Sequence, residues 1–163
     1  MKAPGIIVDI PGFGRRAIHT VVSDYTGTLS YQGKLTPGAK PLLRRLRRLV
    51  DLEIVTGDTY GTARQQLRGI AVPHILQSKK QDLEKRAFVK RFDLKSVAAL
   101  GNGNNDRLLL RVVAEAGGLA IAVDNGEGCA LDALLHAHIF IYGASNALTL
   151  LLNPTALKAT LRF

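Results

Sequence analysis

Short apolar runs alternate with helical segments along most of this 163-residue chain, and this alternation restricts the fold more than any other feature. The runs are mostly uninterrupted by polar residues, which is typical of strands that are buried on both faces. Such strands, alternating with helices of this length, favour a doubly wound, mostly parallel α/β sheet in a three-layer, Rossmann-like arrangement. Because ligands of these sheets bind beyond the carboxyl ends of the strands, we expect the functional residues there.

The expected elements follow one another in regular order. Strands are expected at residues 5–12, 17–24, 52–58, 70–77, 96–103, 119–125 and 137–143. Helices are expected at residues 38–50, 59–69, 79–91 and 104–118, with a further apolar helical stretch before Pro154 and a hairpin tip at residues 31–34. No repeat, low-complexity tract or linker interrupts the series, so the sequence predicts a single domain over residues 1–163.

Composition argues against several other classes of protein. Hydrophobic residues make up 47% of the chain, enough for a core without disulfides, and the single cysteine, Cys129, has no partner within the chain. The first residues lack the basic start and apolar core of a signal peptide, and no apolar run approaches the roughly 20 residues that cross a bilayer. We therefore expect a soluble, cytoplasmic protein with no membrane partner.

The net charge of +9 favours anionic partners without specifying one. Much of this charge lies in "PLLRRLRRLV", where leucines occupy one side of a helix and four arginines share the other: Arg44, Arg45, Arg47 and Arg48. These arginines could dock RNA or a phosphorylated substrate, but a solvated helix face is the plainer interpretation. No aromatic residues are interleaved with them to stack bases, so nucleic-acid binding is a minor hypothesis.

Residues at the ends of expected strands supply what phosphoryl transfer needs. Asp24 can act as a nucleophile and form an acyl phosphate. Thr56, with the backbone amides that begin at Gly57, can hydrogen-bond phosphoryl oxygens, and Lys85 can supply a fixed positive charge. Each residue also has a structural interpretation: a strand-end turn for Asp24, a helix N-cap for Thr56, and a solvated side chain in a charged helix for Lys85.

Mg²⁺ is the expected cofactor, because its preferred ligands are hard oxygens. The chain offers the carboxylates of Asp24 and Asp106 and the backbone carbonyl of Thr26. Alternatively, Asp106 only begins a helix, where a carboxylate complements the helix dipole. None of the four histidines is spaced from Cys129 or an acid as metal ligands are, so we expect structural roles for them.

Four motifs in order, "DYTGTL", "TGDT", "KRAFV" and "GNGNND", resemble those of the haloacid dehalogenase superfamily, and specifically of the phosphorylation domain of P-type ATPases. The similarity continues through "GGLAIAVDNGEGCALDALLHAHIFI" and covers residues 21–141. It implies that Asp24 is the phosphorylated nucleophile and Thr56 a phosphate binder. It also implies that Lys85 is the stabilising cation and Asp106 an acid of the metal site.

The chain departs from the pattern of these relatives at three positions. Asn102 stands where many relatives have a metal-binding aspartate, so its amide oxygen would coordinate Mg²⁺ with one negative charge fewer. Tyr25 replaces the lysine that follows the nucleophile in the pumps. Thr26 stands where phosphatases of the superfamily carry the acid that protonates the leaving group and then activates water. General acid–base catalysis contributes roughly 10²- to 10⁴-fold, so we expect slow hydrolysis that is fastest with activated leaving groups.

The short intervals between the motifs exclude an ion pump and a cap domain. Residues 30–55 have room for a hairpin, the arginine-rich helix and a strand, but not for a nucleotide-binding domain. Residues 58–85 have no room for a mobile cap, so the site is expected to be open or roofed by a neighbouring subunit. The resemblance implies that capless relatives often form oligomers. The segment 144–163 is a candidate for such a contact, with cover for the sheet as the alternative.

The sequence therefore predicts a capless, Mg²⁺-dependent phosphomonoester hydrolase whose phosphorylated substrate is unspecified. The alternative is a regulatory or binding module of the same fold that holds phosphate or Mg²⁺ but turns over negligibly. The replacements at Thr26 and Asn102 favour this alternative, because they weaken acid–base catalysis and metal binding.

Overall fold

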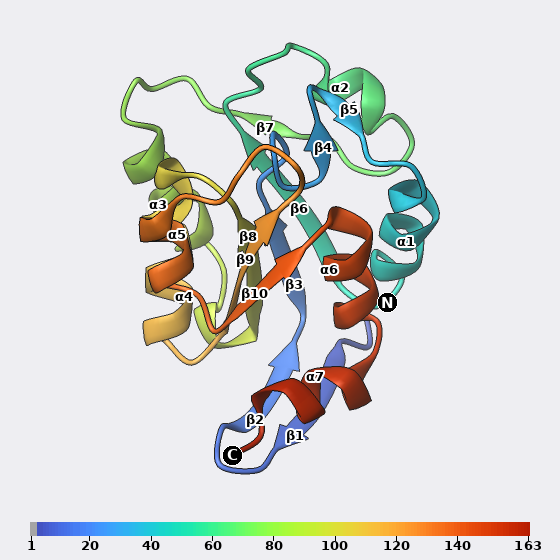
Figure 1. Cartoon of the computed structure of the whole chain (residues 1–163), viewed down its shortest axis with the longest axis vertical. Coiled ribbons are helices and arrows are strands. Elements are labelled where there is room, and N and C mark those ends of the chain that lie inside the picture. Colours follow the sequence, from blue (N-terminus) through green and yellow to red (C-terminus); the bar gives the residue numbers. More distant parts are fainter. Residues whose placement is uncertain (1–2) are drawn as a thin grey trace.

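A six-stranded parallel sheet forms the centre of the computed structural model, which describes residues 3–163 (Figure 1). Its strands are β3 (Thr20–Ser23), β6 (Asp51–Thr56), β7 (His74–Ile75), β8 (Val97–Gly101), β9 (Leu119–Asp124) and β10 (Ile139–Tyr142). Their order across the sheet is β10-β9-β8-β3-β6-β7, and each adjacent pair is parallel. The predicted doubly wound α/β sheet is confirmed.

Helices cover both faces of this sheet (Figure 1). One face carries α1 (Ala39–Leu46) and α6 (Ala144–Leu151), and the other carries α3 (Gln81–Val89), α4 (Arg107–Glu115) and α5 (Leu131–Leu135). Successive strand residues point to opposite faces, so Val21 belongs to one buried cluster and Val22 to the other. Each inner strand must therefore be apolar throughout, as the sequence is. Because α6 packs on β9 and β10, the interpretation of its segment as cover for the sheet is confirmed.

An antiparallel hairpin precedes the central sheet. It consists of β1 (Ile6–Ile10) and β2 (Gly14–Ile18), and α7 (Pro154–Leu161) packs against β1. The prediction of one strand over residues 17–24 was wrong, because the chain changes partners at His19. Residues before His19 pair with β1, whereas Thr20–Ser23 pair with β6 and β8. The apolar pattern continues through this change because both parts are buried.

Two further predictions were too long, and two helices were missed. The helix expected at residues 59–69 is reduced to α2 (Ala63–Gln66), because the chain turns at Gly61 and Gly69, where φ is +67° and +76°. The strand expected at 70–77 is reduced to β7, which begins directly after Pro73, a residue without a backbone N–H. The helices α5 and α7 were not expected.

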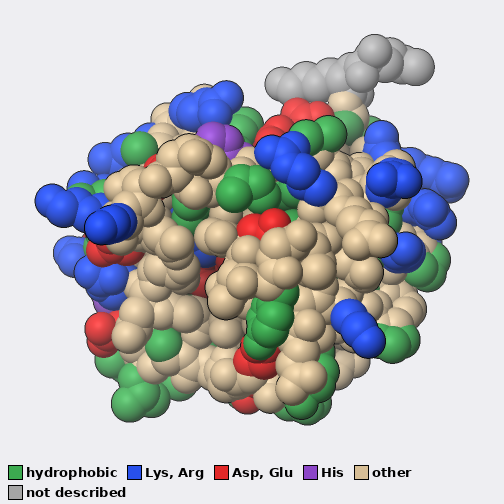
Figure 2. Space-filling view, turned by 90° about the horizontal axis from the view of Figure 1, so that it is seen from above, with side chains coloured by type: hydrophobic (Ala, Val, Ile, Leu, Met, Phe, Trp, Pro, Cys, Tyr) green, Lys and Arg blue, Asp and Glu red, His purple; other side chains and the backbone are tan. Residues whose placement is uncertain are grey.

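The loops at the carboxyl edge of the sheet carry only small insertions. Between Asp24 and Thr56 the chain forms the predicted hairpin, β4 (Ser30–Tyr31) and β5 (Lys34–Leu35), followed by α1 and β6. Between Asp58 and Lys85 it forms α2, β7 and the start of α3. Figure 2 looks down on this edge and shows Lys and Arg side chains mainly toward its periphery. Within residues 3–163, every helix is too short or too polar to cross a bilayer.

Candidate active site

The strand order places the candidate residues at one edge of the sheet. From β3 the chain proceeds outward through β6 and β7 on one side, and later through β8, β9 and β10 on the other. The order therefore reverses between β3 and β8, and a crevice at such a switch point is where ligands bind. Asp24 directly follows β3, Asn102 directly follows β8, and Thr56 ends β6 on the other side of β3.

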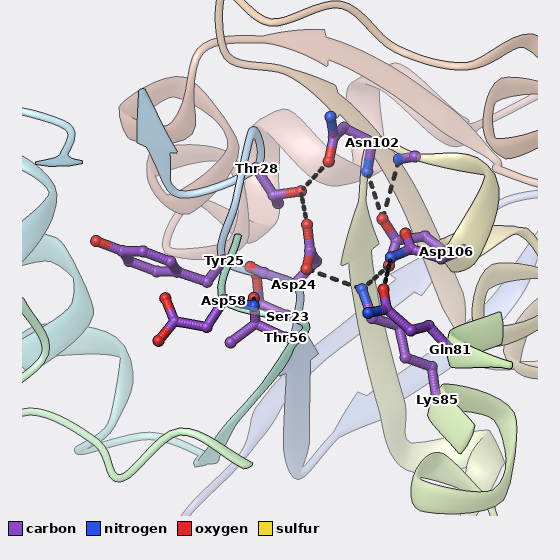
Figure 3. Close-up of polar contacts among 12 residues, drawn as sticks. Ser23, Asp24, Tyr25, Thr28, Thr56, Asp58, Gln81, Lys85, Asn102 and Asp106 are labelled. Carbon is purple, nitrogen blue, oxygen red and sulfur yellow. Dashed lines mark hydrogen bonds and ion pairs between the residues drawn. The ribbon is translucent and has the colours of Figure 1, made fainter. Parts of the chain in front are cut away.

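A buried cluster of three charges lies at this switch point (Figure 3). Lys85 comes from α3 and is 0% exposed, so the alternative interpretation of Lys85 as a solvated side chain is wrong. Its Nζ lies 2.8 Å from Oδ1 of Asp24 and 2.7 Å from Oδ1 of Asp106. Asp24 is 4% exposed and Asp106 is 0% exposed. One ammonium group between two carboxylates leaves the cluster with one negative charge in excess.

The electrostatics of the cluster shift the pKa values of both Asp24 and Lys85. Burial raises the pKa of Asp24 to about 6, with the neighbouring Asp106 carboxylate adding to the increase and Lys85 opposing it. For Lys85, burial alone would lower the pKa, but Asp106 and Asp24 outweigh it and raise the pKa above its ordinary value. Lys85 is therefore a permanent cation, whereas Asp24 takes up a proton in mildly acidic solution.

Thr28 connects Asp24 to the loop that follows β8. Its Oγ1 lies 3.1 Å from Oδ2 of Asp24 and 3.1 Å from Oδ1 of Asn102. A hydroxyl has one hydrogen, so it satisfies one of these oxygens at a time, and two acceptor oxygens converge on the same point. The sequence interpretation missed Thr28, although the residue stands within the "DYTGTL" motif.

Asp106 holds the loop between β8 and α4 in place. Its Oδ2 accepts hydrogen bonds from the backbone amides of Asn102 and Gly103, each at 3.0 Å, while its Oδ1 accepts from Lys85. A Cβ at Gly101 would lie 2.5 Å from the Asp106 side chain, so a larger residue there would displace the carboxylate. The structure thus gives Asp106 a positioning role. Direct ligation of Mg²⁺ by Asp106 stays a prediction, and it requires one of these bonds to be exchanged.

The turn after β6 is fixed by its own side chains. Oγ1 of Thr56 accepts a hydrogen bond from the backbone N–H of Asp58 at 3.0 Å. Oδ1 of Asp58 in turn accepts from the amides of Thr62 and Ala63, both at 3.1 Å, so Asp58 rather than Thr56 caps the start of α2. Thr56 is itself 0% exposed, and its role as a phosphate binder stays a prediction.

Gln81, at the start of α3, lies over this same turn and was missed in the sequence. A Cβ at Gly57 would lie 2.7 Å from its Nε2, so the amide group of Gln81 touches the backbone of the turn. Its Oε1 accepts a hydrogen bond from Nδ2 of Asn105 at 2.9 Å, which connects α3 to the loop after β8. No sequence signal distinguishes Gln81 from the other polar residues of a charged helix.

Thr26 occupies the position where an acid was expected from the resemblance. Its Oγ1 is buried and has no hydrogen-bond partner among residues 3–163. A hydroxyl does not ionise near neutral pH, so it cannot replace a carboxyl group as a general acid or base. The prediction that Thr26 cannot serve as general acid stays a prediction.

The oxygen atoms of the site fit a divalent cation. The cluster of Asp24, Lys85 and Asp106 carries an excess negative charge, and Asp24 and Asn102 direct oxygens toward one point. Among the residues that the structure describes, no three His, Cys, Asp or Glu side chains form a group able to hold a metal. A metal here would therefore depend on Asp24, the amide oxygen of Asn102 and the Thr26 carbonyl, which are hard donors that suit Mg²⁺.

Comparison with known sequences gives one relative. No protein-family model matches the chain. An uncharacterized protein of Methanocaldococcus jannaschii is 43% identical to it over 68 residues, which are 42% of this chain and 69% of that protein.

Comparison with solved structures gives similar folds along most of the chain. The cobalt-bound deoxy-D-mannose-octulosonate 8-phosphate phosphatase of Haemophilus influenzae has a TM-score of 0.62 and 14% identity, covering 88% of this chain and 89% of the phosphatase. The corresponding phosphatase of Moraxella catarrhalis, in complex with magnesium, phosphate and KDO, has a TM-score of 0.59 and 18% identity, covering 84% and 87%. A haloacid dehalogenase-like hydrolase of Streptococcus pneumoniae has a TM-score of 0.56 and 14% identity, covering 81% and 97%. At these identities the likeness concerns the fold.

Proposed function

We propose that this chain is a Mg²⁺-dependent phosphomonoester hydrolase. The chain has the capless haloacid dehalogenase fold and belongs to the same family as the Methanocaldococcus protein. The reaction runs through an aspartyl phosphate on Asp24. The observation that carries the proposal is the buried cluster of Asp24, Lys85 and Asp106 at the switch point of the sheet. Burying three charges costs stability, and such an arrangement is typical of a site that needs a perturbed carboxylate.

In the first step, a carboxylate oxygen of Asp24 attacks the phosphorus atom of the substrate. The new Asp24 O–P bond forms as the ester P–O bond breaks, and the leaving alkoxide takes a proton from water. Lys85 neutralises the growing negative charge, while the Thr56 hydroxyl and the Gly57 amide bind phosphoryl oxygens. Asp24, Asn102 and the Thr26 carbonyl, with Asp106 as a further predicted ligand, would hold Mg²⁺, which would supply additional charge neutralisation.

In the second step, a water molecule attacks the phosphorus of the aspartyl phosphate. Inorganic phosphate is released and the Asp24 carboxylate is restored. The superfamily acid would accelerate both steps, by protonating the alkoxide and by activating the water. Because Thr26 does neither, we expect rates lower by roughly 10²- to 10⁴-fold than with an acid at this position. Esters with good leaving groups should be affected least in the first step.

The second candidate is a regulatory or binding module that holds phosphate or Mg²⁺ with negligible turnover. The unpartnered Thr26 hydroxyl and the neutral Asn102 favour it, because each removes a negative charge that the phosphatases of the superfamily use. A homo-oligomer whose neighbouring subunit covers the candidate active site also remains a proposal, and either function is compatible with it.

Hydrolysis of p-nitrophenyl phosphate, with and without Mg²⁺, distinguishes the two candidates. The wild type, Thr26→Asp and Asp24→Asn are compared, with Thr26→Ser as a control that keeps a hydroxyl. A phosphatase slowed by its threonine predicts Mg²⁺-dependent turnover that rises at least tenfold in Thr26→Asp, stays near the wild-type level in Thr26→Ser and disappears in Asp24→Asn. Turnover in neither the wild type nor Thr26→Asp would favour the binding module. Unchanged turnover in Asp24→Asn would exclude Asp24 as the nucleophile.

A further inference from the structure

A hollow lies beside α2, next to the edge strand β7 of the sheet. It has a volume of about 600 Å³ and lies between the end of α1 and the segment that follows α2. Arg47 and Ile70 of its wall also border a smaller hollow with Asp51 and Leu52, the first residues of β6. Neither hollow is lined by any of the candidate active-site residues Asp24, Thr56, Lys85, Asn102 or Asp106. The hollow is therefore separate from the candidate active site.

Three guanidinium groups line this hollow, from Arg47, Arg64 and Arg68. None of them takes part in an ion pair among the described residues. Asp51 and Glu53 face Arg47 from the neighbouring hollow but do not line this one. The three like charges therefore share a concave surface that contains no carboxylate. Their mutual repulsion is relieved when an anion binds between them.

Arg47 is held in position for such an anion. One of its terminal nitrogens, Nη1, donates a hydrogen bond to the carbonyl of Gly69 at 3.0 Å. This bond uses one of the five N–H donors of the guanidinium group and fixes the orientation of the group. The remaining donors form a fork that matches two oxygens of a phosphate, the geometry for which arginine is preferred over lysine.

The rest of the wall is apolar. It is formed by Ile70, Ala71, Val72 and Pro73, and Val72 is 82% exposed. A volume of several hundred cubic ångströms with an apolar wall and a few charged groups is typical of a small-molecule site. The absence of an aromatic side chain from the residues lining the hollow argues against a surface that stacks the bases of RNA.

We propose that this hollow binds a small molecule that carries two or more linked phosphate groups, the chemical class that includes pyrophosphate and the polyphosphate chains of nucleoside di- and triphosphates. Arg47, Arg64 and Arg68 bind the phosphate groups, and the rest of the molecule lies against the apolar wall. The site is independent of catalysis at Asp24, so it can be tested whether or not the protein hydrolyses phosphate esters.

Isothermal titration calorimetry with ATP, pyrophosphate and inorganic phosphate, in buffer without Mg²⁺, tests the proposal. The variant Arg64→Gln/Arg68→Gln removes two charges from the hollow. Its matched control is Arg44→Gln/Arg45→Gln, which removes two exposed charges from α1 outside the hollow. We expect ATP to bind the wild type more tightly than inorganic phosphate does, with at least tenfold weaker binding in the hollow variant and less than a twofold change in the control.

Several outcomes would overturn the proposal. Equal weakening in the two double variants would mean that ATP is attracted only by the net charge of the protein. Binding that survives in the hollow variant would assign the anion to the active site, and no binding of ATP to the wild type at millimolar concentration would remove the site. A single-stranded RNA that binds more tightly than ATP, with equal losses in both variants, would point instead to an extended basic surface.

Discussion

Replacing Asp24 with asparagine should stabilise the metal-free protein while abolishing its activity. The folded-state pKa of Asp24, about 6, lies above its ordinary value of 3.8. Because the folded-state pKa is the higher one, the carboxyl group stabilises the protein fully at pH values below its unfolded-state pKa. This contribution is lost as the pH rises through the folded-state pKa. A shift of this size corresponds to about 3 kcal/mol at pH 8, and asparagine removes the cost with little change in shape.

The size of this gain should depend on pH and on Mg²⁺. At pH 5 the wild-type carboxyl is mostly protonated in the folded protein, so the gain should fall to about half. For a chain of this length, about 3 kcal/mol corresponds to an increase in Tm of roughly 6 to 12 °C. Added Mg²⁺ should stabilise the wild type at pH 8 and leave Asp24→Asn nearly unchanged, because the ligand carboxylate is missing.

Urea unfolding and thermal melts of the two proteins at pH 5, 6.5 and 8, each in EDTA, measure these differences. An Asp24→Asn variant that is less stable than the wild type at pH 8 would refute the reasoning. A gain of the same size at all three pH values would also refute it, because the effect would then not arise from ionisation of Asp24. The comparison needs no substrate, so it tests the electrostatics of the cluster separately from the proposed reaction.

Three further changes probe individual contacts of the site. Lys85→Met should destabilise the protein at pH 7 by about 3 to 5 kcal/mol in urea unfolding, because it leaves two buried carboxylates unpaired, and less at pH 5. Thr28→Val should lower stability by about 1 to 3 kcal/mol in the same assay, because Asp24 or Asn102 loses a donor, and Mg²⁺ should restore part of the loss. If the protein is a phosphatase, Gln81→Ala should raise KM severalfold with a smaller effect on kcat, whereas Gln77→Ala, outside the site, should change neither. An equal loss of kcat in both glutamine variants would indicate a general effect on folding.

Much of the fold follows from the apolar pattern alone. Strands β8 and β9 are uninterrupted apolar segments, and a parallel sheet buried on both faces is their only efficient arrangement. Once the strands are parallel, residues at their carboxyl ends must meet, which is why Asp24, Thr56 and Asn102 could be brought to one edge from the sequence. The change of partner at His19 could not be predicted in this way, because the pattern reports burial and not which strand lies alongside.

The parts of the site that the residue pattern did not predict are those that depend on contacts between distant elements. Lys85 was singled out by its resemblance to a superfamily motif, but its complete burial was not expected, because it lies among charged residues in a helix and its two carboxylate partners come from other elements. Gln81 was not predicted at all, since its contacts are with Gly57 and Asn105. Its surroundings in the sequence are ordinary, and its role becomes visible only when the loops after β6 and β8 are placed side by side.

Two of the three departures from the superfamily pattern, Thr26 and Asn102, have a common electrostatic consequence. With acids at positions 26 and 102, the cluster around Lys85 would carry three excess negative charges, whereas Thr26 and Asn102 leave it with one. A site with less excess charge gains less from a divalent cation, so this protein should tolerate removal of Mg²⁺ better than a relative that has both acids. Restoring the acid in Thr26→Asp should therefore increase turnover and, at the same time, lower the stability of the metal-free protein and strengthen its response to Mg²⁺. A gain in turnover without this loss of stability would show that the new carboxylate does not share the environment of Asp24.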